Sequence, residues 1–234
     1  MTTSTLSGPT LFTLSDLHSN PALTTSIIRL ANDSFLRPKR LDPVKWSSTG
    51  MRFPTLESYT GMLVEDSVVA LIFDDGDDEK NENLYEGHDE TNGNNSAIGH
   101  PEKLVACAAA VPWRGGWLKD GPETEDGWEI KAVCVDGDAK YARRGLAVQL
   151  LSFLEQHLTA KTMLQEQVSE ERKEHTQGSL TLWIQAAECL NGAYWRKRGY
   201  QEIRRSTQGE GTWGCQTTFE IVVLKKIVHF DIAA

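Results

Sequence analysis

The sequence of 234 residues is long enough for one domain with a full hydrophobic core, or for one domain with a long insertion. Its formal net charge of −9 argues against a dedicated binder of nucleic acid or of anionic membranes, because both functions need a basic surface, and favours a cationic amine as substrate. The four cysteines form no C-x-x-C pair and the histidines are scattered, so we expect free thiols, a reducing compartment and no metal site.

The N-terminus lacks a basic segment followed by an apolar core, and no apolar run reaches about 18 residues. We therefore expect no membrane span and a cytoplasmic or nucleocytoplasmic protein. Residues 1–9 read as a flexible N-terminus and residues 10–234 as a single domain. Residues 74–101 form an acidic low-complexity insertion whose few apolar groups do not offset the entropy of ordering, so they predict a mobile loop within a hairpin.

The first half of the chain predicts short alternating elements. Asn20 and Pro21 mark the start of a helix, because Asn caps helix N-termini and Pro fits the first helical position. Pro38 predicts its end. The expected elements are a strand at 11–14, helices over 20–37 and 54–63, and strands at 68–73 and 104–111.

The stretch from Trp128 to Leu158 predicts a strand, a loop and a helix. Its first part, residues 130–135, is apolar and rich in β-branched side chains, and leucines then recur at every fourth residue from Leu146. Gly145 lies just before this helix, whose first amides have no intrahelical partner and favour an anion. An ordinary strand-to-helix connection explains the same pattern.

Residues 142–147, Ala-Arg-Arg-Gly-Leu-Ala, resemble the pyrophosphate loop Q/R-x-x-G-x-G/A of the GNAT N-acetyltransferases. The glycine and the final alanine match, whereas Ala142 departs from the first position and the loop is longer than usual in that family. The resemblance implies acetyl-CoA or coenzyme A as co-substrate. Its pyrophosphate would meet the backbone amides of Arg143, Arg144, Gly145, Leu146, Ala147 and Val148.

The C-terminal part predicts a strand at 180–184, a helix over 186–198 ended by Gly199, and strands at 201–205 and 217–225. Strand–helix–strand crossovers join parallel strands, so we expect an α/β domain with a mixed, twisted sheet flanked by helices. The resemblance implies the GNAT fold, in which the strand at 128–135 is splayed from the strand at 180–184. It also implies a bulge at residues 133–135, where the backbone of Val133, Cys134 and Val135 would hold the pantetheine arm and the acyl carbonyl.

Two catalytic candidates follow from the resemblance. Trp195-Arg-Lys-Arg-Gly-Tyr200 occupies the frame of the family's Tyr-x-x-x-Gly-Phe sequence, and the real tyrosine, Tyr194, lies one place earlier as the candidate acid. Glu129, six residues before Val135, resembles in its offset the catalytic glutamate of the histone-acetylating branch and is the candidate base. Burial would raise its pKa, and the alternative is an exposed strand glutamate.

Other residues carry open alternatives. Asn191 is either a pantetheine contact or a surface residue. Cys134 and Cys189 suggest a covalent acyl-cysteine, but neither has an adjacent histidine in the sequence, which argues against it. The resemblance implies that three aromatic residues line the acceptor pocket, and the alternative is that they simply pack in the core: Trp46, Phe53 and Tyr59.

The expected function is direct transfer of acetyl from acetyl-CoA to a primary amine, on a small molecule or a protein. The alternative is a non-catalytic acyl-CoA-binding or regulatory module. We expect a monomer or homodimer, with residues 221–224 completing the sheet or pairing with another subunit.

Overall fold

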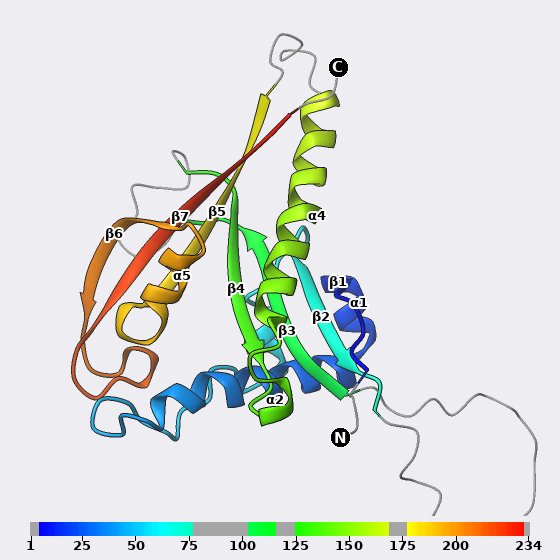
Figure 1. The fold of residues 1–234 in the computed structure, drawn as a ribbon. Coiled ribbons are helices and arrows are strands. Elements are labelled where there is room, and N and C mark those ends of the chain that lie inside the picture. Colours follow the sequence, from blue (N-terminus) through cyan, green and yellow to red (C-terminus); the bar gives the residue numbers. More distant parts are fainter. Residues whose placement is uncertain (1–4, 77–102, 116–124, 169–176, 232–234) are drawn as a thin grey trace, which may run out of the picture.

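The computed structural model describes residues 5–76, 103–115, 125–168 and 177–231 (Figure 1). The first four residues and residues 77–101 of the predicted acidic insertion lie outside this part of the chain. Within it, no helix is both long and apolar enough to cross a membrane.

One mixed sheet of seven strands forms the centre of the structure, in the order β1-β2-β3-β4-β5-β7-β6. Only β4 and β5 are parallel, and every other neighbouring pair is antiparallel. The strands are β1 (Thr10–Thr13), β2 (Val68–Asp74), β3 (Lys103–Pro112), β4 (Trp128–Val135), β5 (Gln177–Ala187), β6 (Gln201–Gln208) and β7 (Phe219–Asp231). The predicted α/β class is confirmed. Because β7 lies between β5 and β6, residues 221–224 complete the sheet.

The helices cover both faces of this sheet. They are α1 (Leu14–Ser19), α2 (Pro21–Lys39), α3 (Leu56–Thr60), α4 (Leu146–Val168) and α5 (Ala193–Lys197), with the short turns η1 (Ala139–Tyr141), η3 (Glu188–Gly192) and η4 (Thr212–Gly214). The leucine stripe of α4 packs with α5 in the larger core on one face, and α2 and α3 close a second core on the other (Figure 1). Burial of these two apolar faces stabilises the fold.

The predicted start of α2 is confirmed, and its predicted end is wrong. The side chain of Asn20 accepts a hydrogen bond from the amide of Leu23 at 3.0 Å, and Pro21 is the first helical residue. The helix continues through Pro38 to Lys39. Proline removes one amide donor but leaves its neighbours free to bond, and the amide of Arg40 still reaches the carbonyl of Leu36 at 3.1 Å.

The helix predicted over residues 186–198 begins later than expected. Pairing with β7 continues along β5 as far as Ala187, so the strand ladder overrides the helical pattern of the sequence. A π-helical turn, η3, follows and leads into the five-residue helix α5. Gly199 ends the helix with a φ of 86°, as predicted.

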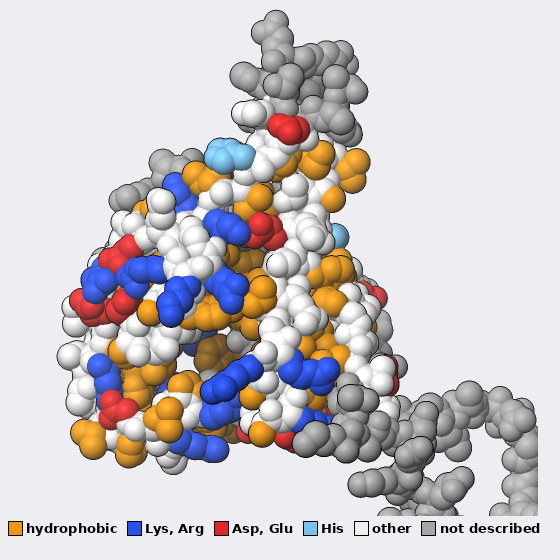
Figure 2. Space-filling view, viewed as in Figure 1, with side chains coloured by type: hydrophobic (Ala, Val, Ile, Leu, Met, Phe, Trp, Pro, Cys, Tyr) orange, Lys and Arg blue, Asp and Glu red, His pale blue; other side chains and the backbone are white. Residues whose placement is uncertain are grey.

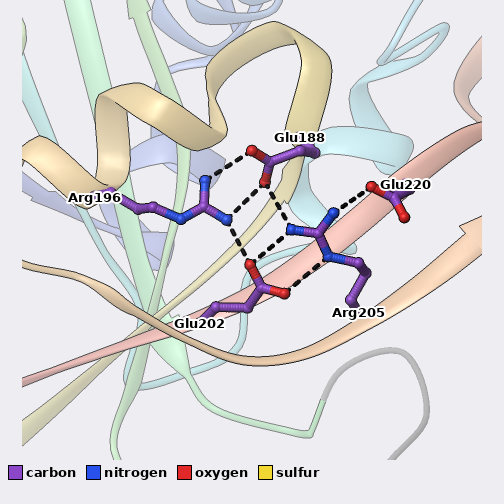
Figure 3. A network of polar contacts seen from close by, with 5 residues as sticks. All are labelled: Glu188, Arg196, Glu202, Arg205 and Glu220. Carbon is purple, nitrogen blue, oxygen red and sulfur yellow. Dashed lines mark hydrogen bonds and ion pairs between the residues drawn. The ribbon is translucent and has the colours of Figure 1, made fainter.

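A network of charged side chains fixes η3 and α5 to the strands β6 and β7 (Figure 3). The guanidinium of Arg196 contacts Glu188 at 2.7 Å and Glu202 at 2.5 Å. Arg205 joins Glu202 at 2.8 Å and also pairs with Glu220 on β7. Hydrogen bonds from Arg205, together with Arg196, lower the pKa of the Glu202 carboxyl to about 2, because they stabilise its ionised form against the cost of desolvation.

This network predicts an acid-sensitive contribution to stability. The folded pKa of Glu202 lies below the unfolded value of about 4.3, so its stabilisation is present above that pH and is lost as the pH falls towards 2. We expect Glu202→Gln to be less stable at pH 6 and to lose less stability between pH 4.5 and 2 than the wild type. Urea unfolding across this pH range measures the difference. The exposed Glu65→Gln is the control, and a Glu202→Gln curve parallel to the wild type would contradict the prediction.

Candidate functional site

Strands β4 and β5 touch along only a short part of their length. Their ladder consists of Trp128 opposite Leu182 and Glu129 opposite Trp183, after which β4 follows β3 and β5 follows β7. Figure 1 shows the two strands diverging beyond this contact. Among the described residues, the edge of residues 130–135 that faces β5 therefore has no strand partner, and the predicted splay is confirmed.

The predicted bulge exists, but it lies one position earlier than expected. Ala132 has a φ of 49°, and the register with β3 shifts between the partners Cys107 and Ala109. A single extra residue moves the following side chains to the opposite face. Val133 and Val135 thus pack in the same core as Ile130, on the α4 face, although an unbroken strand would place them on the other.

The bulge also decides which backbone groups face the gap. The amide of Asp136 donates to the carbonyl of Val105 on β3 at 2.8 Å. Because backbone groups along a strand point alternately to its two sides, those of Val135 and Val133 point away from β3, towards the open edge. The carbonyl of Val135 already accepts hydrogen bonds from Ser34 at 3.0 Å and Arg37 at 2.9 Å, so the amide is the backbone group of Val135 that remains for a ligand. Cys134 faces β3 and is buried on the α2 face, so the structure does not bring it to the gap.

A cavity of about 270 Å³ lies between α4, α5 and the diverging strands. Its apolar floor includes Ile130 on β4 and Leu182 on β5, and Val148 lines it from α4. Figure 2 shows a hollow on this face with Lys and Arg side chains around it. Sequence reasoning missed its basic lining residues, which come from distant segments: Lys197, Arg198 and Lys226, the last of which pairs with Glu155 at 2.6 Å.

The loop before α4 ends with two left-handed residues, Arg143 (φ 60°) and Gly145 (φ 74°). The first helical hydrogen bond of α4 runs from the amide of Gln149 to the carbonyl of Gly145 at 3.0 Å. The amides of residues 146–148 therefore precede it and carry the positive end of the helix dipole. Leu146 is buried, while residues 142–145 are exposed, so this helix terminus is accessible from solvent.

Ion pairs between exposed lysines and less exposed aspartates hold this loop to the neighbouring strands. Asp74 on β2 is 3% exposed and accepts the hydroxyl of Tyr141 at 2.5 Å and the ammonium of Lys140 at 3.0 Å. Asp136 pairs with Lys103 on β3 at 2.8 Å. The turn η1 lies within this loop, and its Tyr141 is buried.

Glu129 lies on the opposite face of the sheet from the cavity. It is 5% exposed, so the alternative of an exposed strand glutamate is wrong. One carboxylate oxygen accepts the amide of Gln185 on β5 at 2.7 Å, and the other meets the ammonium of Lys131 at 2.9 Å. These two donors fix the carboxylate beside the point where β4 and β5 begin to separate.

Tyr194 reaches the cavity side of the gap from α5. Its ring packs against the core of α4, and its hydroxyl is buried with no hydrogen-bond partner in the described structure. A buried unpaired hydroxyl is costly, and Tyr59 in the core on the other face has one as well. Asn191 is exposed in η3 and does not line the cavity.

The comparisons with known proteins agree with this architecture. No protein-family model matches the sequence, and no curated protein is similar enough to count as a relative. A solved structure from Acinetobacter baylyi, provisionally assigned as an acetyltransferase, aligns with a TM-score of 0.51 and 12% identity over 97% of this chain and 95% of its own. Two others have a TM-score of 0.47 and cover 94% of this chain and 99% of theirs: a Streptococcus pneumoniae acetyltransferase of the GNAT family (9% identity) and a Brucella melitensis ribosomal-protein-alanine N-acetyltransferase (18%).

The protein has the GNAT fold. In the GNAT frame, the position expected for tyrosine holds Trp195, which is 5% exposed and packs edge-on against Tyr200 at 5.5 Å. One helical step turns a side chain by about 100°, and Tyr194 accordingly lies beside Trp195 rather than in its place. The departure from the GNAT sequence therefore assigns the indole to the core, and Tyr194 packs beside it on the α4 face without lining the cavity.

The aromatic candidates for an acceptor pocket are core residues of this GNAT fold. Trp46, Phe53 and Tyr59 are 1%, 5% and 0% exposed, which confirms the packing interpretation. The loops beside them are joined, because the amide of Ser47 donates to Gly214 at 2.8 Å and that of Gln216 donates to Lys45 at 2.8 Å. The α2–α3 loop (residues 40–55) and the β6–β7 loop (residues 209–218) thus form one wall on the Glu129 face.

Proposed function

We propose that the protein is an acyl-CoA-dependent N-acyltransferase that transfers acetyl from acetyl-CoA directly to a primary amine. One observation carries the proposal: the unpaired edge of β4, the first turn of α4 and the cavity meet at one place. An extended thioester with a pyrophosphate at one end needs these features together, since its amides require an open strand edge and its phosphates require free donors.

The donor would lie along the open edge of β4. The amides of residues 146–148, with the charges of Arg143 and Arg144 next to them, would bind the pyrophosphate. The backbone of Val133 and Val135 would hold the pantetheine arm and donate to the acyl oxygen as negative charge develops on it. Cys134 drops out of this group because it faces β3.

The two faces of the sheet would divide the remaining chemistry. On the α2 face, Glu129 would take a proton from the attacking ammonium, directly or through water. The nitrogen would then attack the carbonyl carbon through the gap between β4 and β5. On the α5 face, the hydroxyl of Tyr194 would give its proton to the departing thiolate.

A non-catalytic acyl-CoA-binding module is the alternative. Both carboxylate oxygens of Glu129 are already engaged, by Gln185 and Lys131, which favours a structural role for this residue. Such a module would bind acetyl-CoA with similar affinity but would form no acetylated amine. Product formation therefore separates the two functions.

The first prediction concerns acetyl-CoA binding at Gly145. A Cβ there meets no atom within 4 Å, and Asn and Asp both tolerate a positive φ, so Gly145→Asn and Gly145→Asp differ mainly in charge. We expect micromolar binding to the wild type and at least about tenfold weaker binding to the Asp variant than to the Asn variant, because its carboxylate faces the pyrophosphate. Calorimetric titration measures both. Equal affinities would overturn the assignment of this loop, and no binding to the wild type would overturn the proposed function.

The second prediction compares two tyrosines with buried, unpartnered hydroxyls, Tyr194 and Tyr59. Tyr194→Phe removes a hydroxyl without breaking a hydrogen bond, so we expect an unchanged or raised melting temperature. The kcat should fall by about 100-fold, the lower end of what a general acid contributes, with acetyl-CoA affinity retained. Tyr59→Phe is the matched control and should keep full activity. A Tyr194→Phe enzyme with the wild-type kcat would exclude Tyr194 as the acid.

The third prediction concerns Glu129 as the base. We expect Glu129→Gln to bind acetyl-CoA normally and to lower kcat/KM by about 100-fold at neutral pH, since the amide cannot accept the proton. The deficit should shrink at high pH, where the free amine is already deprotonated. Steady-state rates from pH 6 to 10 test this. A pH–rate profile with the same shape as the wild type would exclude Glu129 as the base.

A further inference from the structure

A guanidinium surrounded by aromatic rings lies in the wall on the Glu129 face. The central carbon of Arg52 is 5.4 Å from the ring centre of Phe35, 5.8 Å from that of Phe53 and 5.2 Å from that of Trp213. These rings come from α2, the α2–α3 loop and the β6–β7 loop. Stacking uses the flat faces of a guanidinium and leaves its N–H edge available for a planar anion.

Neither Arg52 nor its neighbour Lys39 forms an ion pair with a carboxylate in the part of the chain that the structure describes. The ammonium of Lys39 donates to the carbonyl of Trp213 and lies 5.4 Å from the ring centre of Trp46. Desolvation and the positive charge of Arg52 lower the pKa of Lys39. Two cations thus lie close enough to repel each other.

The carboxylate whose charge acts on Arg52 is that of the candidate base, Glu129. Desolvation lowers the pKa of Arg52, and the negative charge of Glu129 opposes that shift. Glu129, however, is already paired with Lys131. The positive charges of Arg52 and Lys39 therefore exceed the negative charge that acts on them, although the formal net charge of the protein is −9. Such a local excess attracts an anion.

The backbone around Arg52 is held in place. The side chain of Asn32 clamps the next residue, Phe53, by donating to its carbonyl at 2.9 Å and accepting from its amide at 2.9 Å. On the other side, Trp213 adopts a left-handed backbone with a φ of 52°, an unfavourable conformation for a bulky residue that the hydrogen bond from Lys39 helps to maintain. The guanidinium is thus preorganised, which lowers the entropic cost of binding.

We infer that Arg52, with Lys39 beside it, binds a carboxylate of the acceptor, so that the acceptor is an amine that also carries a carboxylate. This inference rests on the proposed function, and it makes Arg52 a specificity-determining residue. The N–H edge of Arg52 forms a bidentate pair with the carboxylate, and the ammonium of the same molecule points to Glu129. A free amino acid and a peptide with an acidic residue near its N-terminus both offer this chemistry.

Matched acceptors test the inference with wild-type protein and acetyl-CoA. In each pair one carboxylate is replaced by an amide: alanine and alaninamide, glutamate and glutamine, and peptides with Asp or Asn as the second residue. In the pair whose carboxylate lies at the right distance from the amine to reach Arg52, we expect the acid to be acetylated in preference to its amide. The amino acid pairs and the peptide pair identify which source of the carboxylate fits.

Variants of Arg52 then connect this preference to the residue. We expect Arg52→Gln to lower kcat/KM for the acid by about ten- to a hundredfold, mainly through KM, because a charge-assisted hydrogen bond is lost. The rate with the amide and the KM for acetyl-CoA should not change, and Arg52→Lys should recover part of the preference. Arg29→Gln, an exposed arginine on the outer face of α2, is the matched control for loss of one charge.

Equal use of acids and amides by the wild type would overturn the inference, as would an equal loss for both in Arg52→Gln. If acetyl-CoA binds but no amine is acetylated, the proposed enzyme fails while the anion site is still tested. In that case N-acetylalanine, N-acetylglutamate, the N-acetylated Asp peptide and their amide counterparts are titrated calorimetrically into the CoA-bound protein. Binding of an acid that is lost in Arg52→Gln supports the site, and binding that does not distinguish acid from amide overturns it.

Discussion

The short contact between β4 and β5 is the constraint on which the rest of the structure depends. Parallel strands that paired along their whole length would leave no unpaired backbone in the middle of the sheet. Here only two residue pairs form, and the bulge at Ala132 bends β4 and reverses the alternation of its side chains. An unpaired edge in the interior of a sheet is unfavourable unless a ligand or solvent satisfies it. The cavity beside Ile130 and Leu182 provides that access.

The gap brings together groups from both faces of the sheet. Tyr194 and the first turn of α4 belong to one face, whereas Glu129 and the joined α2–α3 and β6–β7 loops belong to the other. Each side has its own support, since the network around Arg205 fixes α5 and the clamp of Asn32 fixes the loop at Phe53. A donor and an acceptor can therefore approach from opposite faces and meet only where the strands separate.

Local patterns in the sequence predicted much of this arrangement. Asn20 with Pro21 marked the start of α2, and the leucines that recur from Leu146 marked α4, because capping and helical periodicity depend on residues a few positions apart. The start of α5 was missed because pairing with β7 lies far along the chain and extends β5. The bulge was predicted one residue too late, because the left-handed residue is Ala132 and an alanine, unlike a glycine, does not indicate a left-handed backbone in the sequence.

The candidate site was less predictable for the same reason. Gly145 and Glu129 were found through local motifs, but Gln185, which holds Glu129, and Lys226 at the cavity come from strands whose register no short pattern specifies. Arg52 gave no signal at all. Its rings belong to three separate segments, and only the bridge between two loops brings them together.

The charge of the whole chain and the charge of the site point to different substrates. A net charge of −9 favours a cationic amine in general, yet two neighbouring cations, Arg52 and Lys39, lie in the wall on the Glu129 face. A purely cationic amine would be repelled there by Arg52 and Lys39, and Glu129, shared with Lys131, offers little to offset that repulsion. Under the proposed function, an amine with its own carboxylate would remove the conflict, because it would neutralise the cations of Arg52 and Lys39 while its ammonium lies near Glu129, the proposed base. The same charges would also orient such a molecule, and the proposed attack through the gap between two strands needs an oriented amine.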